Sequence, residues 1–227
     1  MPQPYQYESI QEYMSSLVPA RPAEMQGMER YAEEHDFPII GPLAGYYCYQ
    51  LARMTRALSI FEMGSGYGYS TAWFAKAVKE NSAEQAQAPG SVQHVVWDKA
   101  LSEMARAHLK NLKLEQFVEF HVSEAVQALR ASEKEFDLIF CDIDKEDYPA
   151  ALTVINEKLR PGGVLIIDNM LWNGRIFDPA DQSASTRGVR EFTRQICGSP
   201  DWIVSLAPLR DGLIVAHKKN NAWEFNA

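Results

Sequence analysis

The sequence has few cysteines, no dense basic run and no long apolar run, and each absence removes a class of protein. Three widely spaced cysteines in 227 residues form neither a disulfide framework nor a paired metal-binding motif. A net charge of -8 disfavours extended contact with nucleic acid phosphates or anionic lipid. No stretch approaches the roughly 18 uncharged apolar residues of a membrane-spanning helix. We expect a small molecule as ligand, and neither membrane nor nucleic acid as partner. The absence of a signal-peptide pattern at the N-terminus predicts a cytoplasmic protein.

What the chain does contain is a regular alternation of apolar strand segments with helical segments. Strands are expected at residues 58–63, 92–97, 117–122, 138–141, 164–167, 202–206 and 213–217. This pattern predicts one α/β domain over residues 1–227, built on a doubly wound, mostly parallel sheet. Residues 1–45 would form a helical N-terminal extension, amphipathic up to residue 36, followed by a loop that covers a ligand site.

Proline, glycine and polar clusters set the boundaries that we expect for several elements. Residues 37–45 hold two prolines and two glycines, so a loop is expected there before a helix over residues 46–56. Residues 81–90 are rich in Gln, Ala and Ser and are expected to form a polar surface insertion. Residues 160–163 hold one proline and two glycines and are expected to end a helix before the strand at 164–167.

A glycine-rich turn, Gly64–Ser70, follows the first strand and precedes a helix, which is the arrangement of nucleotide-cofactor sites. Its glycines permit a tight turn and a close approach of backbone N–H groups to a ligand. A dinucleotide fingerprint would need glycine where this chain has Tyr69, which disfavours an NAD-dependent dehydrogenase. Glu62 lies in the strand and can accept hydrogen bonds from an ammonium group, which S-adenosylmethionine (SAM) carries and NAD lacks. The alternative is a tight turn without a ligand.

Asp98 is the acidic residue at the end of the second strand, where such folds commonly bind the ribose hydroxyls. The alternative reading is an N-cap for the helix that follows. The sequence leaves both open.

Carboxylates follow two further strands at the points where they end. Asp142, Asp144 and Lys145 come after one strand, and Asp168 and Asn169 after the next. If these strands are neighbours, Asp142, Asp168 and Asn169 converge at one edge of the sheet. Two carboxylates and an amide oxygen suit a magnesium-like, calcium-like or manganese-like cation. The alternative is that they are turn formers and helix caps, with Lys145 a surface lysine paired to an acid.

Taken in order, five stretches resemble the cation-dependent O-methyltransferases, the family that includes the caffeoyl-coenzyme A and catechol enzymes. They are FEMGSGYGYSTAW, FDLIFCDIDKEDYPA, LRPGGVLIIDNMLWNGR, TRGVREF and PLRDGLIVA. The resemblance implies a seven-stranded, mostly parallel sheet with an antiparallel strand near the C-terminal edge. It also implies a homodimer.

The resemblance also implies roles for individual residues. Asp142, Asp168 and Asn169 would bind the divalent cation, with Mg²⁺ expected and Ca²⁺ or Mn²⁺ possible, and Lys145 would be the general base. Around SAM it places Glu62 and Asp144 at the amino group, Gly64, Gly68 and Ser70 at the carboxylate, and Ala125 near the adenine. The chain departs from the family pattern in one place. The ribose-binding acid of the family usually stands two residues before the position of Asp98, and this chain has Val96 there.

The function implied is metal-dependent methyl transfer from SAM to a hydroxyl group of a small catechol-type phenol, with Lys145 and Asp142 as catalytic residues. One alternative has the same methyl transfer with a different acceptor, a hydroxylated uridine of transfer RNA. The excess of acidic residues in the chain disfavours it. Another is a SAM-binding module without turnover, which Val96 keeps open.

Overall fold

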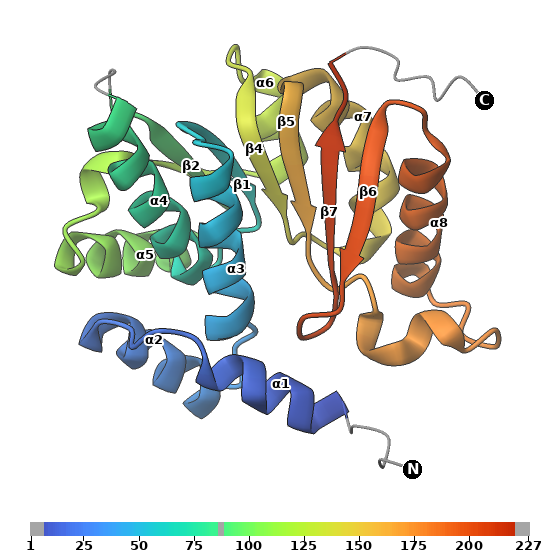
Figure 1. Cartoon of the computed structure of the whole chain (residues 1–227), viewed down its shortest axis with the longest axis horizontal. Coiled ribbons are helices and arrows are strands. Elements are labelled where there is room, and N and C mark those ends of the chain that lie inside the picture. Colours follow the sequence, from blue (N-terminus) through green and yellow to red (C-terminus); the bar gives the residue numbers. More distant parts are fainter. Residues whose placement is uncertain (1–6, 86–88, 221–227) are drawn as a thin grey trace.

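The computed structural model describes residues 7–85 and 89–220 and contains one seven-stranded sheet (Figure 1). The strands are β1 (Ser59–Met63), β2 (Ser91–Val96), β3 (Val118–Val122), β4 (Phe136–Cys141), β5 (Leu159–Ile167), β6 (Trp202–Ala207) and β7 (Leu213–Lys218). Their order is β3-β2-β1-β4-β5-β7-β6. The first five are parallel, whereas β7 runs antiparallel to both β5 and β6. The predicted fold class is confirmed.

Helices cover both faces of this sheet. They are α1 (Tyr7–Ser16), α2 (Ala23–Glu34), α3 (Gly41–Met54), α4 (Tyr69–Gln85), α5 (Lys99–Asn111), α6 (Ala125–Ala131), α7 (Tyr148–Lys158) and α8 (Ala184–Gly198). Short 3₁₀ turns are η1 (Glu115–Phe117), η2 (Lys145–Asp147) and η3 (Trp172–Phe177). In Figure 1, α1 and α2 lie below the sheet, on the side where the parallel strands end. Within the described ranges, no helix has the length and apolar character needed to cross a membrane.

The central strands are buried on both faces, as expected for parallel strands between two helical layers. Leu138 and Phe140 of β4 belong to the apolar cluster that packs against α3 and α4. Ile139 and Cys141 alternate with them and belong to the cluster under α6, α7 and α8. All four are fully buried. This double burial fixes the register of the strands and therefore the heights at which they end.

The expected loop at residues 37–45 is wrong in its second half, because α3 already begins at Gly41. Pro42 lies in the first turn of that helix, where a missing N–H group removes no hydrogen bond. Gly45 serves packing between helices, since a Cβ atom there would lie 2.2 Å from the indole Nε1 of Trp73. The loop that remains, before Gly41, includes Phe37 and Pro38.

Two other expected boundaries are also wrong. Helix α4 continues to Gln85, so the expected polar insertion at 81–90 is helical at its start, and residues 86–88 lie outside the described ranges. Asn81 is buried and its Nδ2 atom donates to the carbonyl oxygens of Ala52 and Ala57 at 3.0 and 2.8 Å. Residues 160–163 belong to β5 and do not precede it, because the strand begins at Leu159 beside Phe136 of β4.

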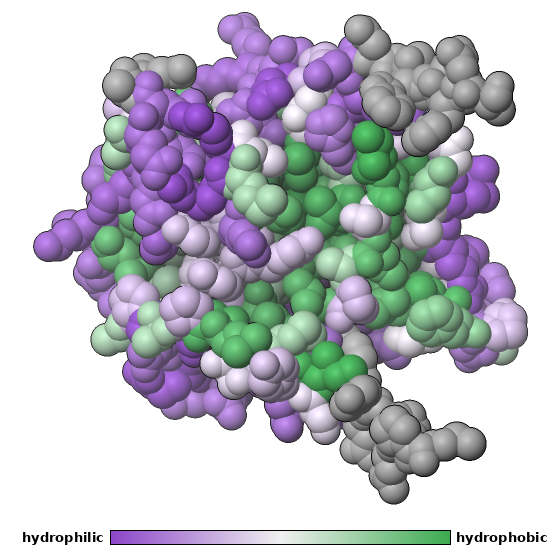
Figure 2. Space-filling model, viewed as in Figure 1, coloured by the Kyte–Doolittle hydropathy of each residue, from purple (hydrophilic) through white to green (hydrophobic). Residues whose placement is uncertain are grey.

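One face of the sheet is covered unevenly. Figure 2 shows apolar side chains gathered over β5, β7 and β6, which α3 and α4 leave uncovered in that view. Edge strand β6 carries Ile203, which is 57% exposed. Apolar surface of this kind is typical of protein interfaces. The homodimer implied by the resemblance stays a prediction.

Gly188 lets α8 approach the chain immediately after β4. A Cβ atom at this position would lie 2.1 Å from the backbone oxygen of Lys145 and 2.8 Å from the Cα atom of Glu146. Gly198, at the end of the same helix, has no atom within 4 Å of such a Cβ. The absence of a side chain at Gly188 therefore fixes where η2 lies.

We expect Gly188→Ala to destabilise the protein by about 2 kcal/mol, the usual scale for overpacking a tight contact. For a chain of this size the midpoint of thermal unfolding would fall by about 5 °C. Circular dichroism melting would measure it, with Gly198→Ala as control. Since alanine favours helix over glycine, an unchanged or higher midpoint for Gly188→Ala would contradict the steric reading.

Candidate active site

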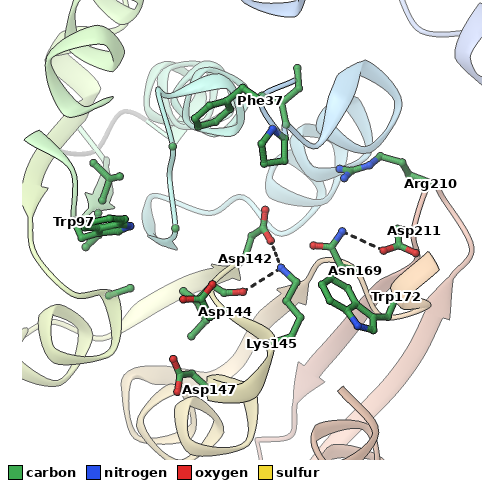
Figure 3. A pocket seen from close by; sticks show the side chains of 18 of the residues that line it. Phe37, Trp97, Asp142, Asp144, Lys145, Asp147, Asn169, Trp172, Arg210 and Asp211 are labelled. Atoms are coloured by element: carbon green, nitrogen blue, oxygen red, sulfur yellow. Dashed lines mark hydrogen bonds and ion pairs between the residues drawn. The ribbon is translucent and has the colours of Figure 1, made fainter. Parts of the chain in front are cut away.

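A cavity of about 1130 Å³ opens where β1, β2, β4 and β5 end (Figure 3). One wall comes from Phe37, Pro38 and Ile39, which lie between α2 and α3 in the chain. The glycine turn, the segment after β4 and the segment after β5 supply the other sides. Crevices at the carboxyl ends of the strands are where open α/β sheets bind ligands. Residues 37–39 belong to the expected N-terminal extension, whose covering role stays a prediction.

The glycine turn is held close to the segment that follows β4. Gly64 has φ +85°, a conformation that favours glycine, and a Cβ atom there would lie 2.2 Å from the backbone oxygen of Asp142. Gly64 and Gly66 line the large cavity, whereas Ser70 lines a smaller hollow beside it. Gly68 faces α5, with its missing Cβ 2.8 Å from that of Ala105. Gly68 therefore shapes the turn without lining either hollow.

Glu62 lies beneath this turn and is fully buried. Burial raises the pKa of its carboxyl group to about 7, although the hydroxyls of Ser70, Thr71 and Ser65 act in the opposite direction. Its Oε2 atom accepts a hydrogen bond from the Thr71 hydroxyl. Within the described part of the chain, its Oε1 atom has no hydrogen-bond partner. A hydrogen-bond donor at this oxygen would satisfy it, but Glu62 is not among the residues that line either hollow.

The end of β2 presents apolar side chains to the cavity. Val96 and Trp97 line it, and Trp97 is 80% exposed. Asp98 is the N-cap of α5, because its carboxylate accepts hydrogen bonds from the backbone N–H groups of Ala100 and Leu101 at 2.7 and 3.4 Å. The N-cap reading is therefore confirmed, Asp98 is not among the cavity-lining residues, and its contact with a ribose stays a prediction. Ala125, the first residue of α6, also lines the cavity.

The segment after β4 places a lysine against a carboxylate. The Nζ atom of Lys145 lies 2.8 Å from Oδ1 of Asp142 and donates to the backbone oxygen of Ile143 at 3.1 Å. It also lies 5.4 Å from the ring centroid of Tyr148 and 5.7 Å from that of Trp172. Figure 3 shows Lys145 pointing at Asp142 inside the cavity. Asp144 lines the same wall.

Asp168 and Asn169 come next to this group, as expected for neighbouring strands. The side chain of Asp168 is buried, and its Oδ1 atom accepts a hydrogen bond from the Asn169 N–H group at 2.8 Å. Burial and the nearby Asp142 carboxylate raise the pKa of Asp168 to about 6. Asn169 lines the cavity, and its Nδ2 atom donates to Oδ2 of Asp211 at 3.3 Å. Asp142, Asp168 and Asn169 therefore lie at two adjacent strand ends, as expected, and their role as cation ligands stays a prediction.

No group of three or more His, Cys, Asp and Glu side chains in residues 7–85 and 89–220 is placed to hold a metal ion. The predicted triad contains only two carboxylates, and its third member is the amide of Asn169. It is therefore not a group of the kind just described. Its oxygens are of the type that hard cations bind.

Comparison with known proteins agrees with this geometry. Residues 28–219 match the model of a family described as O-methyltransferase. The chain belongs to that O-methyltransferase family. The family and the enzyme class expected from the motifs are both confirmed.

The relatives cover most of the chain. A catechol O-methyltransferase of Niastella koreensis is 26% identical over 196 residues, 84% of this chain and 85% of that protein. Caffeoyl-CoA O-methyltransferase 2 of Populus trichocarpa is 24% identical over 94% of this chain and 90% of its own. The structure of the O-methyltransferase TomG from Streptomyces achromogenes, in complex with SAM, has a TM-score of 0.81 and 27% identity. The match covers 93% of this chain and 96% of that one.

Sequence reasoning missed the residues of this O-methyltransferase that come from the turn before β7. Arg210 and Asp211 line the cavity, and Arg210 lies 3.2 Å from Asp168 (Nη1 to Oδ2). Because β7 is antiparallel to β5, the residues that precede it lie beside the end of β5. The Asp-Gly turn between two expected strands was visible in the sequence, but the pairing of β7 with β5 was not.

The raised pKa of Glu62 predicts a pH dependence of stability. The pKa is about 7 in the folded protein against a usual 4.5, so the folded state holds a proton that the unfolded state loses between these values. Stability therefore falls as the pH rises through this window.

Glu62→Gln removes this titration while keeping the shape of the side chain. Between pH 5.5 and 7.5 the unfolding free energy of the native protein should fall by about 2 kcal/mol relative to the variant. Urea unfolding at both pH values would measure the difference. Parallel changes in the two proteins would refute a raised pKa at Glu62.

Proposed function

We propose that this enzyme transfers a methyl group from SAM to a hydroxyl of a small catechol-type phenol, and that a divalent cation, Mg²⁺ first, assists. The observation that carries the proposal is the convergence of Asp142, Asn169 and Lys145 on one cavity with the glycine turn, next to the buried carboxylate of Asp168. The relatives named for catechol and caffeoyl-CoA support the acceptor class. The proposed chemistry needs only the phenol, SAM and the cation, so we propose no macromolecular partner for it.

The residues around the glycine turn fit SAM. The approach of Gly64 to Asp142 leaves backbone without a side chain at the cavity wall, and the unsatisfied Oε1 atom of Glu62 suits the ammonium group of an amino acid. Asp144 and Ser70 would complete the polar contacts, and Ala125 would border the adenine. When bound, SAM supplies a methyl group activated by a positively charged sulfur. Val96 and Trp97 offer apolar surface at the end of β2, and Val96 stands where the resemblance implies a ribose-binding acid, so the ribose would be held by other contacts.

The donor set of the triad fits a hard divalent cation. Asp142 and Asp168 lie close enough for the negative charge of one to raise the pKa of the other, and a positive charge near both would relieve this repulsion. When bound, the cation supplies Lewis acidity that favours the phenolate and a template for two adjacent hydroxyl groups. Asp142, Asp168 and Asn169 would hold it, through oxygens that suit Mg²⁺, Ca²⁺ or Mn²⁺.

Lys145 is placed to receive the proton of the acceptor hydroxyl. A phenol has a pKa of about 10, so it needs a base at neutral pH. Lys145 is only 11% exposed in its side chain and lies between Asp142 and the rings of Tyr148 and Trp172. In its neutral form the amine would accept the proton, while these rings limit the access of water. Asp142 keeps the lysine directed at the cavity.

The first test is formation of S-adenosylhomocysteine from SAM with a panel of catechols, such as caffeate and 3,4-dihydroxybenzoate. We expect turnover with Mg²⁺ and its loss with excess EDTA. Mass spectrometry of the products would identify an O-methylated acceptor. Turnover that is indifferent to EDTA would remove the cation from the proposal, and SAM binding without turnover on any phenol would remove the acceptor class.

Asp142→Ala should abolish the cation-assisted reaction while leaving SAM binding largely intact. Loss of both a cation ligand and the partner of Lys145 is expected to lower kcat by at least about 10²-fold, the lower end for a positioned acid or base. Calorimetry with SAM would check the cofactor site. Asp147→Ala is the matched control, because Asp147 lines the same cavity outside the triad. Full activity of Asp142→Ala would refute its role.

A further inference from the structure

Arg210 is paired with Asp168, the buried carboxylate of the predicted cation site. Its Nη1 atom lies 3.2 Å from Oδ2 of Asp168, in an ion pair whose side chains are 35% and 1% exposed respectively. The charge of Arg210 lowers the pKa of Asp168, against the stronger effect of burial. The other carboxylate oxygen already accepts the N–H group of Asn169. Each oxygen of Asp168 therefore has a donor.

The turn that carries Arg210 is held from two sides. Arg210 has φ +53°, a conformation that side chains seldom adopt. Its backbone N–H group donates to Oε1 of Gln11 in α1 at 2.9 Å, and Nε2 of Gln11 donates to the backbone oxygen of Pro208 at 2.9 Å. On the other side, Asp211 accepts hydrogen bonds from Asn169 and Asn173. The backbone of Arg210 is therefore held in place from both sides.

A second cation completes the balance of charge. Lys145 contacts Asp142 while Arg210 contacts Asp168, so the two carboxylates of the triad face two positive side chains. Their formal charges sum to zero. A divalent cation that approaches Asp168 meets a positively charged guanidinium on one of its oxygens, and the two compete for the negative charge of the carboxylate.

We propose that Arg210 is a built-in counterion of the cation site: it pairs with Asp168 when no metal is bound, and a divalent cation must compete with it for the charge of that carboxylate. Arg210 thereby sets a low affinity for the metal and makes the folded site stable without it. This inference rests on the proposed function, because it takes Asp142, Asp168 and Asn169 as the ligands. Arg210 acts through Asp168 and is a positioning residue.

The decisive comparison is metal binding by the protein and by Arg210→Gln, without SAM or acceptor. Mn²⁺ titration followed by electron paramagnetic resonance, and calorimetry with Mg²⁺, measure affinity independently of activity. Removing a positive charge a few ångströms from the ion is expected to tighten binding on the order of tenfold or more. Arg160→Gln is the matched control. Arg160 also pairs with an aspartate, Asp137, and is 39% exposed, but it lies at the opposite end of the sheet.

Thermal unfolding gives a second readout. In EDTA, Arg210→Gln should unfold at a lower temperature than the native protein, because the buried Asp168 loses its partner. Saturating Mg²⁺ should raise the midpoint of the variant more than that of the native protein, since the ion replaces the lost charge and binds more tightly. Arg210→Lys keeps the charge and should bind Mn²⁺ with nearly native affinity.

The outcomes separate this inference from the proposed function. Equal or weaker Mn²⁺ binding by a folded Arg210→Gln, or an equal gain in Arg160→Gln, overturns the role of Arg210 and leaves the cation site in place. If neither the native protein nor Arg210→Gln binds Mn²⁺ or Mg²⁺, the cation of the proposed function falls as well. If Arg210→Gln does not fold, tight binding by Arg210→Lys would overturn the role and native-like binding would support it.

Discussion

The site depends on backbone hydrogen bonds that continue the sheet past the ends of its strands. The N–H group of Asp142 donates to Met63 of β1 at 2.9 Å, and that of Asp168 donates to Cys141 of β4 at 3.1 Å. Each bond extends the parallel pairing into the segment that carries chemistry. The glycine turn, the segment after β4 and the segment after β5 are thereby held at fixed heights, and Gly64 can rest against the backbone of Asp142.

This rigid frame tolerates carboxylates that would be unfavourable elsewhere. A buried carboxylate destabilises the folded state unless it is protonated, hydrogen-bonded or paired with a cation. Glu62 shows the first two solutions, with a raised pKa and the Thr71 hydroxyl. Asp168 shows the third, with Arg210. Under the proposed function, both residues would lie near a positively charged group of a ligand, and that charge would stabilise them further. Helix α1 is also connected to the site, because the side chain of Gln11 accepts a hydrogen bond from the backbone N–H group of Arg210.

Much of the fold followed from local patterns. Apolar segments of strand length alternate with helical segments, and all seven expected strands are present. The expected element boundaries are wrong where proline and glycine suggest the end of a helix or strand. Pro42 begins a helix, Gly45 allows Trp73 to pack, and residues 160–163 lie within β5. A glycine required by a close contact looks the same in a sequence as a glycine in a turn, because the contact lies on another element.

The sequence by itself determined the strands, the glycine turn, and the acids that follow β4 and β5, because these features depend on neighbours along the chain. From them the family and the triad of Asp142, Asp168 and Asn169 could be predicted. Only the tertiary structure decided that Asp98 caps a helix and that Arg210 pairs with Asp168, 42 residues earlier in the chain. The antiparallel pairing of β7 with β5 creates that ion pair. Pairing order is set by burial over the whole sheet, which no local segment of the sequence encodes.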